Sequence, residues 1–163
     1  MDPVTVSTTI ARSREDVFAY LRDIANHPEF TDHFLKDWHL TREESAGAGA
    51  GARFRVDAPL TRFGWADTTL TELEPPYRIA QHGRGGKFNR IRQRGEFRLT
   101  DQPGGTRVEW TLETLPVLPS DRVLELVAGR AWFRRQLGRS MRRLRAILEE
   151  DRDRGERASI AGG

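Results

Sequence analysis

Hydrophobic and polar residues alternate along most of the first 115 positions, and this alternation is typical of half-buried strands. It is clearest at residues 90–99, where arginine or glutamate fills every even position. The odd positions of the same segment are Ile91, Gln93, Gly95, Phe97 and Leu99. Successive side chains of a strand point to opposite faces, so we expect a charged outer face and an inward-pointing Gln93.

Similar patterns predict six further strands, at residues 3–11, 36–43, 53–57, 65–74, 77–82 and 106–115. Segments 83–86 (GRGG) and 101–105 (DQPGG) are typical of hairpin turns. Because short turns join consecutive strands, the sheet should be an antiparallel meander. Its single apolar face then needs a cover.

Two short helices are expected between the first two strands. Ser13 precedes Asp16 by three residues, a spacing typical of a capped helix start, and apolar residues recur every three or four positions after it. Segment 26–28 (NHP) should end this helix, and residues 29–34 should form a second helical turn.

The cover for the sheet should be a long helix at residues 120–149, starting at Ser120 and spanning roughly 45 Å if unbroken. Helical phasing places seven apolar residues on one stripe: Val123, Leu126, Val127, Leu137, Met141, Leu144 and Leu148.

Arg130 and Arg134 fall in the middle of that stripe, while Trp132 points the opposite way. A buried arginine is costly without a partner. Three explanations compete: a kink at Gly129 shifts the helical phase, the arginines reach out past a neighbouring edge, or they face a polar-lined cavity. The third would make this helix the lid of a binding site.

The order of elements resembles the helix-grip fold of the START-like (SRPBCC) superfamily, in its polyketide cyclase/dehydrase branch. The resemblance is carried by VTVSTTIARSREDVFAYLRDIANHPEF, GAGARF, TLTELEPPYRI, GEFRL, GGTRVEWTLE and MRRLRAILE. It implies an α+β fold in which a curved antiparallel sheet of about seven strands wraps around the C-terminal helix. Residues 1–150 would form this single domain, and residues 151–163 a flexible tail.

Members of such families grip a hydrophobic small molecule between sheet and helix, so the resemblance implies an aromatic polyketide, lipid, quinone or hormone-like ligand. The candidate ligand-binding residues are Trp38, Phe54, Trp65, Asp67, Gln81, Gln93, Phe97, Trp110, Val127, Arg130, Arg134 and Leu137. The aromatics would form walls, although core packing alone is the favoured explanation for Phe54 and Trp110 taken individually. An arginine could bind a carboxylate or polarise a carbonyl, with Asp67 holding it or acting as a base. A bulge in residues 65–74 would instead turn Asp67 to solvent.

Composition narrows the function further. The 163 residues contain no cysteine, no apolar run long enough to span a bilayer and no signal peptide, so a cytoplasmic protein is expected. The pI of 9.9 accompanies a net charge of only +3 and reflects a bias toward arginine that is typical of high-GC bacteria. The four histidines have no metal-site spacing, and residues 83–87 lack the context of a phosphate loop. We expect no metal or cofactor, and no catalytic residue can be assigned.

Three functions fit these observations. The leading hypothesis is a binder of a hydrophobic, aromatic or polyketide-like molecule, with cyclisation or dehydration as its enzymatic form. The second is a non-catalytic lipid or quinone carrier. The third is a regulator that docks on RNA or ribosomes through Arg90, Arg92, Arg94 and Arg98, but interspersed glutamates disfavour nucleic acid as a partner. Neither membrane insertion nor an oligomeric state is indicated.

Overall fold

The computed structural model describes residues 1–59, 62, 64–115, 118–124 and 129–150. Seven strands form one antiparallel sheet in the order β1-β7-β6-β5-β4-β3-β2, which confirms the predicted meander. They are β1 (Val4–Ile10), β2 (Leu35–Leu40), β3 (Gly51–Val56), β4 (Trp65–Glu74), β5 (Arg78–Gly85), β6 (Ile91–Gln102) and β7 (Gly105–Leu115). The helices are α1 (Arg14–Leu21), η1 (Ile24–Asn26), α2 (Pro28–Thr31), η2 (Lys87–Asn89), α3 (Pro119–Leu124) and α4 (Arg130–Glu150).

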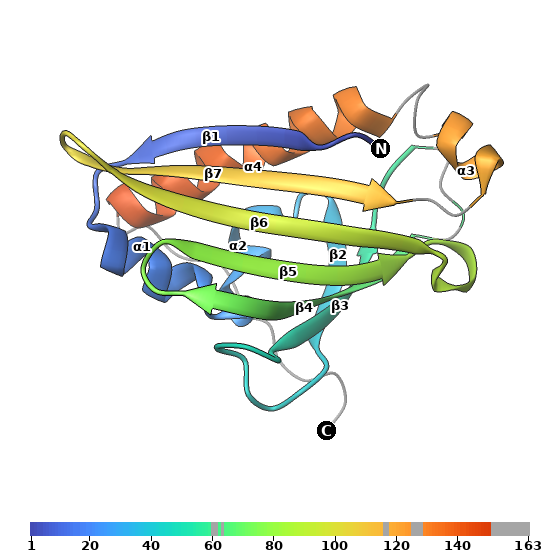
Figure 1. The fold of residues 1–163 in the computed structure, drawn as a ribbon, viewed down its shortest axis with the longest axis horizontal. Coiled ribbons are helices and arrows are strands. Elements are labelled where there is room, and N and C mark those ends of the chain that lie inside the picture. The colour runs from blue at the N-terminus through green and yellow to red at the C-terminus, as the bar shows by residue number, and fades with distance from the viewer. Residues whose placement is uncertain (60–61, 63, 116–117, 125–128, 151–163) are drawn as a thin grey trace.

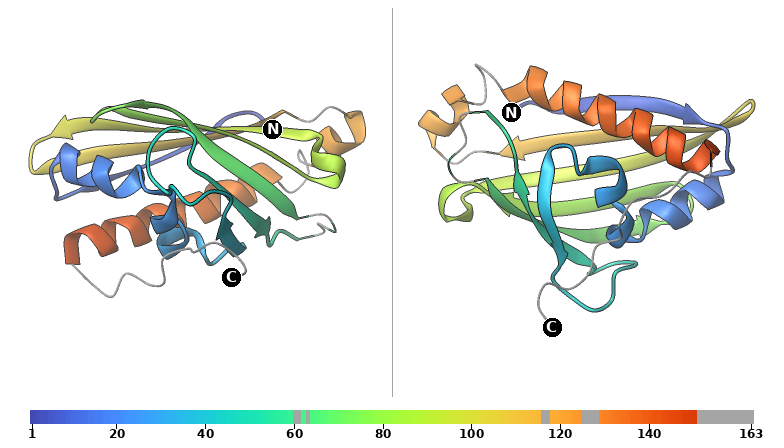
Figure 2. Two further views of the ribbon diagram at one scale, coloured as in Figure 1. Left: turned by 90° about the horizontal axis from the view of Figure 1, so that it is seen from below. Right: turned by 180° about the vertical axis from the view of Figure 1, so that it is seen from behind.

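The sheet curves around α4, which lies on the same side as α1 and α2 (Figures 1 and 2). The helix-grip architecture is therefore confirmed. The predicted tail lies outside the described residues. No helix among the described residues is both long and apolar enough to cross a membrane.

The alternation in β6 predicted its two faces correctly. Phe97 and Leu99 are buried, whereas Arg92, Arg94 and Arg98 are exposed. Ser13 also caps α1 as expected, because its side chain accepts a hydrogen bond from the Asp16 backbone N at 3.2 Å.

The predicted long C-terminal helix is confirmed as α4, which begins at Arg130; the first part of the predicted range forms α3, and residues 125–128 between α3 and α4 lie outside the described residues. Ser120 lies inside α3, which begins at Pro119. Val123 of the predicted stripe is 61% exposed, and Leu126 and Val127 lie outside the described residues.

The buried face of α4 contains Leu137, Met141, Leu144 and Leu148, as predicted. One turn before Leu137, the residue that packs against the core is Phe133 rather than Arg134. Arg130 and Arg134 are exposed. A helix has 3.6 residues per turn, so a small roll decides between positions 133 and 134, and burying the aromatic ring costs far less than burying a charge.

Trp132 was also misplaced. It packs against the core instead of pointing away, and its ring meets the Phe34 ring edge-on at 5.8 Å. The rotation of α4 about its axis is fixed further along the helix by Arg143, which pairs with Asp32. The Arg143 guanidinium also donates to the Glu29 carbonyl at 3.0 Å and to His33 Nδ1 at 3.2 Å. These contacts attach α4 to the α2 region.

Residues 83–85 of the predicted turn are part of β5, which continues to Gly85. The tip of the hairpin is formed by η2 instead. Strand pairing can pass through Gly83 because it has no side chain: a Cβ there would lie 2.0 Å from the Asp67 carbonyl oxygen of β4. The glycine therefore serves close strand approach, not chain reversal.

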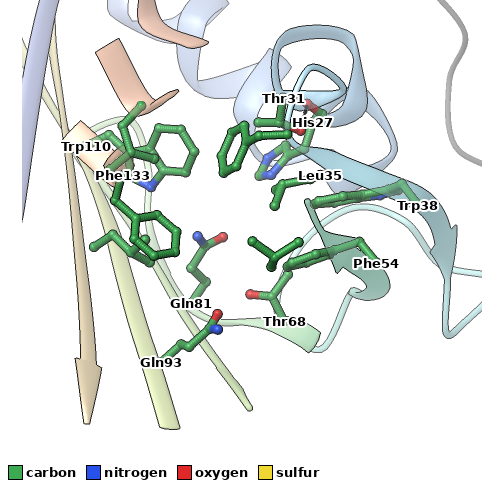
Figure 3. A pocket seen from close by; sticks show the side chains of 14 residues that line it. His27, Thr31, Leu35, Trp38, Phe54, Thr68, Gln81, Gln93, Trp110 and Phe133 are labelled. Atoms are coloured by element: carbon green, nitrogen blue, oxygen red, sulfur yellow. Dashed lines mark hydrogen bonds between the residues drawn. The ribbon is translucent and has the colours of Figure 1, made fainter. Parts of the chain in front are cut away.

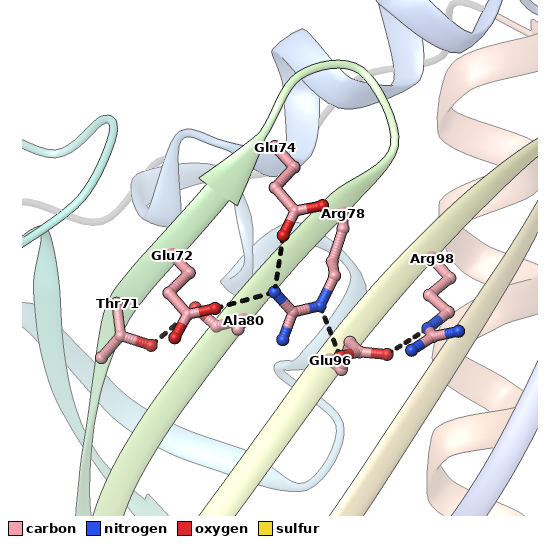
Figure 4. Close-up of polar contacts among 7 residues, drawn as sticks. All are labelled: Thr71, Glu72, Glu74, Arg78, Ala80, Glu96 and Arg98. Carbon is pink, nitrogen blue, oxygen red and sulfur yellow. Dashed lines mark hydrogen bonds and ion pairs between the residues drawn. The ribbon is translucent and has the colours of Figure 1, made fainter.

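Charged residues on the outer face of the sheet pair with one another (Figure 4). Arg78 contacts Glu72 at 2.8 Å, Glu74 at 3.1 Å and Glu96 at 2.7 Å, and Glu96 also pairs with Arg98. Burial raises the pKa of Glu96, but hydrogen bonds from Arg78 and Arg98 outweigh it and bring that pKa below its ordinary value. The arginine face is thus interleaved with carboxylates, which weakens the case for RNA there.

Candidate functional site

A cavity lies between the inner face of the sheet, the α2 region and the first turns of α4 (Figure 3). Its walls are formed by His27, Thr31, Phe34, Leu35, Trp38, Phe54, Val56, Thr68, Gln81, Gln93, Trp110, Leu112, Phe133 and Leu137. The enclosed volume of the cavity is about 50 Å³. A larger ligand would therefore have to displace half-buried wall residues such as Phe133.

Stacked aromatic rings form two sides of this cavity. Trp38 of β2 lies parallel to Phe54 of β3, with centroids 4.7 Å apart and planes 8° apart. Trp110 of β7 stacks on Phe97 of β6 at 5.0 Å. Such flat apolar walls suit a ligand that contains planar rings.

Uncharged polar groups are set among these rings. Gln81 of β5 extends over Gly95, its cross-strand partner, where a Cβ would lie 2.5 Å from the Gln81 Nε2. The Gln81 Oε1 and the indole nitrogens of Trp38 and Trp110 are buried without a hydrogen-bond partner among the described residues. Buried polar atoms are normally paired, so these three have unused hydrogen-bonding capacity.

His27 occupies the junction between η1 and α2 and is only 3% exposed. Its Nε2 lies 2.8 Å from the Leu21 carbonyl oxygen, and its ring packs against Phe30, Trp38 and Phe97. Burial lowers the pKa of His27 to about 4, against smaller opposing effects of the Leu21 hydrogen bond and Asp23. His27 is therefore neutral at pH 7, with its Nε2–H donating to Leu21.

Half of the predicted site residues meet at this cavity: Trp38, Phe54, Gln81, Gln93, Trp110 and Leu137. Phe97 lies behind the wall, fully buried against Trp110. Val127 is outside the described residues. Contact of any of these residues with a ligand stays a prediction.

Trp65 and Asp67 do not face the cavity, so their predicted inward direction is wrong. The inward residues at this end of β4 are Ala66, Thr68 and Leu70. Asp67 is on the outer face, where its Oδ1 accepts from the Arg84 backbone N at 3.1 Å. The structure instead has the bulge expected as the alternative, because the register shifts between Leu70 and Glu72.

Arg130 and Arg134 are likewise absent from the cavity wall. The Arg130 side chain lies on the surface, 3.5 Å from the Pro3 carbonyl oxygen. As a result, no charged side chain lines the cavity among the described residues. The predicted carboxylate-binding or carbonyl-polarising role of these arginines has no support in this geometry.

Half of the eight wall residues missed by sequence reasoning come from segment 27–35, in which His27, Thr31, Phe34 and Leu35 line the cavity. We expected His27 only as part of the segment that ends the first helix. Its position three residues after Ile24 and three before Phe30, both fully buried, was the available signal for burial.

Gln81→Met should increase the free energy of unfolding by about 1 kcal/mol, because it removes a buried oxygen that has no partner and keeps the side-chain shape. Urea denaturation of the ligand-free protein would measure this. Gln93→Met is the matched control, because Gln93 is half-buried and lies two residue pairs further along the β5–β6 ladder. It should change the free energy of unfolding less. A destabilised Gln81→Met protein would show that the oxygen is satisfied in solution.

Known proteins share this architecture. A family model described as polyketide cyclase/dehydrase and lipid transport matches residues 1–149. No curated protein matches the sequence. The fold is similar to that of TTHA0849 from Thermus thermophilus, with a TM-score of 0.71 at 16% identity over 93% of this chain and 99% of that one.

Two further solved structures show the same fold. DR_A0006 from Deinococcus radiodurans has a TM-score of 0.61 at 23% identity, over 91% of this chain and 98% of that one. The major latex-like protein 151 of Panax ginseng has a TM-score of 0.66 at 15% identity, over 90% and 96% of the two chains. At such identities the likeness concerns the fold.

Proposed function

Because the chain belongs to the polyketide cyclase/dehydrase and lipid transport family, we propose that it binds an uncharged molecule containing planar rings in this cavity. The supporting observation is a wall of stacked aromatic rings that contains three polar atoms without a partner. No charged side chain lines it among the described residues. A carboxylate or phosphate entering it would lose its hydration without gaining a counter-ion. A ligand carbonyl or hydroxyl would instead match the indole N–H groups and the Gln81 oxygen.

Binding is better supported than catalysis. His27 is the one titratable side chain among the described wall residues, and its low pKa makes it a weak base at neutral pH. Cyclisation or dehydration is the alternative function of the same cavity. A lipid or quinone carrier is the third, although the two stacked walls favour rings over acyl chains. The cytoplasmic location stays a prediction.

Two fluorescent probes that differ by one charge test the proposal. N-phenylnaphthylamine is neutral and aromatic, and anilinonaphthalene sulfonate adds a sulfonate to the same ring system. We expect saturable binding of the neutral probe and binding of the sulfonate at least about tenfold weaker, since the cavity has no cation. Equal binding of both probes would contradict an uncharged ligand.

A blocking variant locates the probe. Thr68→Trp places an indole inside the cavity and should weaken binding of the neutral probe by at least about tenfold. Thr69→Trp, one residue along β4 and on the outer face, is the matched control and should bind as the unchanged protein does. The same loss in both variants, or in neither, would place the probe elsewhere.

A further inference from the structure

Phe88 presents its ring to solvent at the tip of the β5–β6 hairpin, where it is 84% exposed. Its backbone has a φ of 59° and that of Asn89 a φ of 53°. The left-handed region is unfavourable for a bulky residue such as phenylalanine. Neither the cavity nor the core accounts for this strained, exposed ring, which indicates a role at the surface.

Other apolar side chains are exposed at the same end of the molecule. Leu115 ends β7 and lies opposite Arg92 of β6, while Leu118 and Val123 of the α3 region are 40% and 61% exposed. Figure 1 and both views of Figure 2 place α3 and the β5–β6 hairpin at one end of the sheet. We call residues 84–92, Leu115 and the segment 118–123 the hairpin end.

Positive charge surrounds these apolar groups. Residues 84–92 contain Arg84, Lys87, Arg90 and Arg92 and no acidic residue, while segment 118–123 contains one acidic residue, Asp121, beside the exposed Arg122. The Lys87 ammonium lies 5.3 Å from the centre of the Phe88 ring. In the sheet register Asp67 lies opposite Arg84, and Glu113 lies opposite Arg94, two residues beyond Arg92. The hairpin end is therefore both apolar and cationic.

We propose that the hairpin end docks on the surface of an anionic phospholipid membrane. Phe88, Leu118 and Val123 would enter the interfacial layer while the surrounding cations meet the headgroup phosphates. Phe88 is the single ring of the hairpin end, and the aliphatic Leu118 and Val123 offer no stacking face to nucleobases, so this composition favours lipid over RNA. Gln93 and Phe133, which line the cavity, lie near this end of β6 and α4, so a docked protein would hold its cavity close to the membrane.

Vesicle sedimentation with the full chain tests this docking. We expect binding to vesicles of phosphatidylcholine with about 30% phosphatidylglycerol, and much weaker binding to pure phosphatidylcholine or at high salt. Lys87→Glu reverses one charge and should weaken vesicle binding severalfold. Absence of binding to the anionic vesicles at low salt would overturn the proposal.

The decisive variant is Phe88→Asn, because asparagine tolerates the left-handed backbone and the hairpin should stay folded. Vesicle binding should fall at least about tenfold, with N-phenylnaphthylamine binding and thermal unfolding unchanged. Tyr77→Ser removes a 53% exposed aromatic from the β4–β5 turn, which lies at the opposite end of the sheet, and should not change vesicle binding. Undiminished vesicle binding by Phe88→Asn, or binding of poly-U RNA without vesicle binding, would refute membrane docking.

Discussion

The free energy of unfolding should fall by about 3 kcal/mol as the pH is lowered from 6.5 to about 4, through His27 alone. Above pH 6.5 the imidazole is neutral in both states and contributes nothing. Between pH 6.5 and 4 the unfolded chain binds a proton that the buried ring does not, so the unfolded state gains stability. The loss is complete below pH 4, where both forms are protonated.

Urea denaturation at pH 7, 5.5 and 4.5 would measure this effect, with His27→Gln as the comparison. The variant should be less stable at pH 7, since it disturbs the Leu21 hydrogen bond, but its stability should depend far less on pH. Burial also lowers the pKa of the half-exposed His33, helped by Arg139 and Arg143, so the comparison is best made in a His33→Gln background. An unchanged pH dependence in His27→Gln would disprove the assignment.

Gly83→Ala should destabilise the protein by about 3 kcal/mol or more, the second large effect we expect. The added methyl would lie 2.0 Å from the Asp67 carbonyl oxygen and 3.2 Å from the Thr68 Cα. These are backbone atoms of a paired strand, so the clash can be relieved only by moving β4 and β5 apart. That movement would also shift Thr68 and Gln81 in the cavity wall. Thermal and urea unfolding measure the loss.

Gly138→Ala in α4 is the matched control, with the opposite sign. A Cβ at Gly138 would meet only the Arg142 guanidinium, at 3.8 Å. Alanine in a helix interior should therefore raise stability by about 0.5–1 kcal/mol. If Gly83→Ala were as stable as the unchanged protein, the close approach of β4 and β5 at this position would not exist in solution.

The strands were predictable because side chains alternate between the two faces of a strand wherever its hydrogen-bonded pairing with the neighbouring strand is regular. The pattern of β6 gave both faces and the inward direction of Gln93. It failed in β4 because the register shift near Thr71 changes which residues point inward, and a bulge leaves no clear mark in composition. Trp65 and Asp67 were misplaced for this reason.

The helix was harder to predict, because adjacent positions differ by only ~100° and an amphipathic stripe is broad. Leu137 and Met141 were placed correctly. The choice between Phe133 and Arg134 as the residue that faces the sheet depends on tertiary contacts, such as the hydrogen bond from Arg143 to the α2 region. His27 was missed for a related reason. Its burial depends on packing against Trp38 of β2 and Phe97 of β6. These contacts join segments that are not adjacent in the sequence, so a local pattern does not reveal them.

The irregularity in β2 has a consequence for solubility. This strand is at the edge of the sheet, where unpaired backbone groups can recruit a strand from another molecule and start aggregation. Its register shifts between Lys36 and His39, Asp37 has a φ of 54°, and Arg55 holds the Asp37 carboxylate at 2.9 Å. The kinked, charged edge cannot accept a regular strand, so the stack of Trp38 on Phe54 is protected from intermolecular pairing at this border.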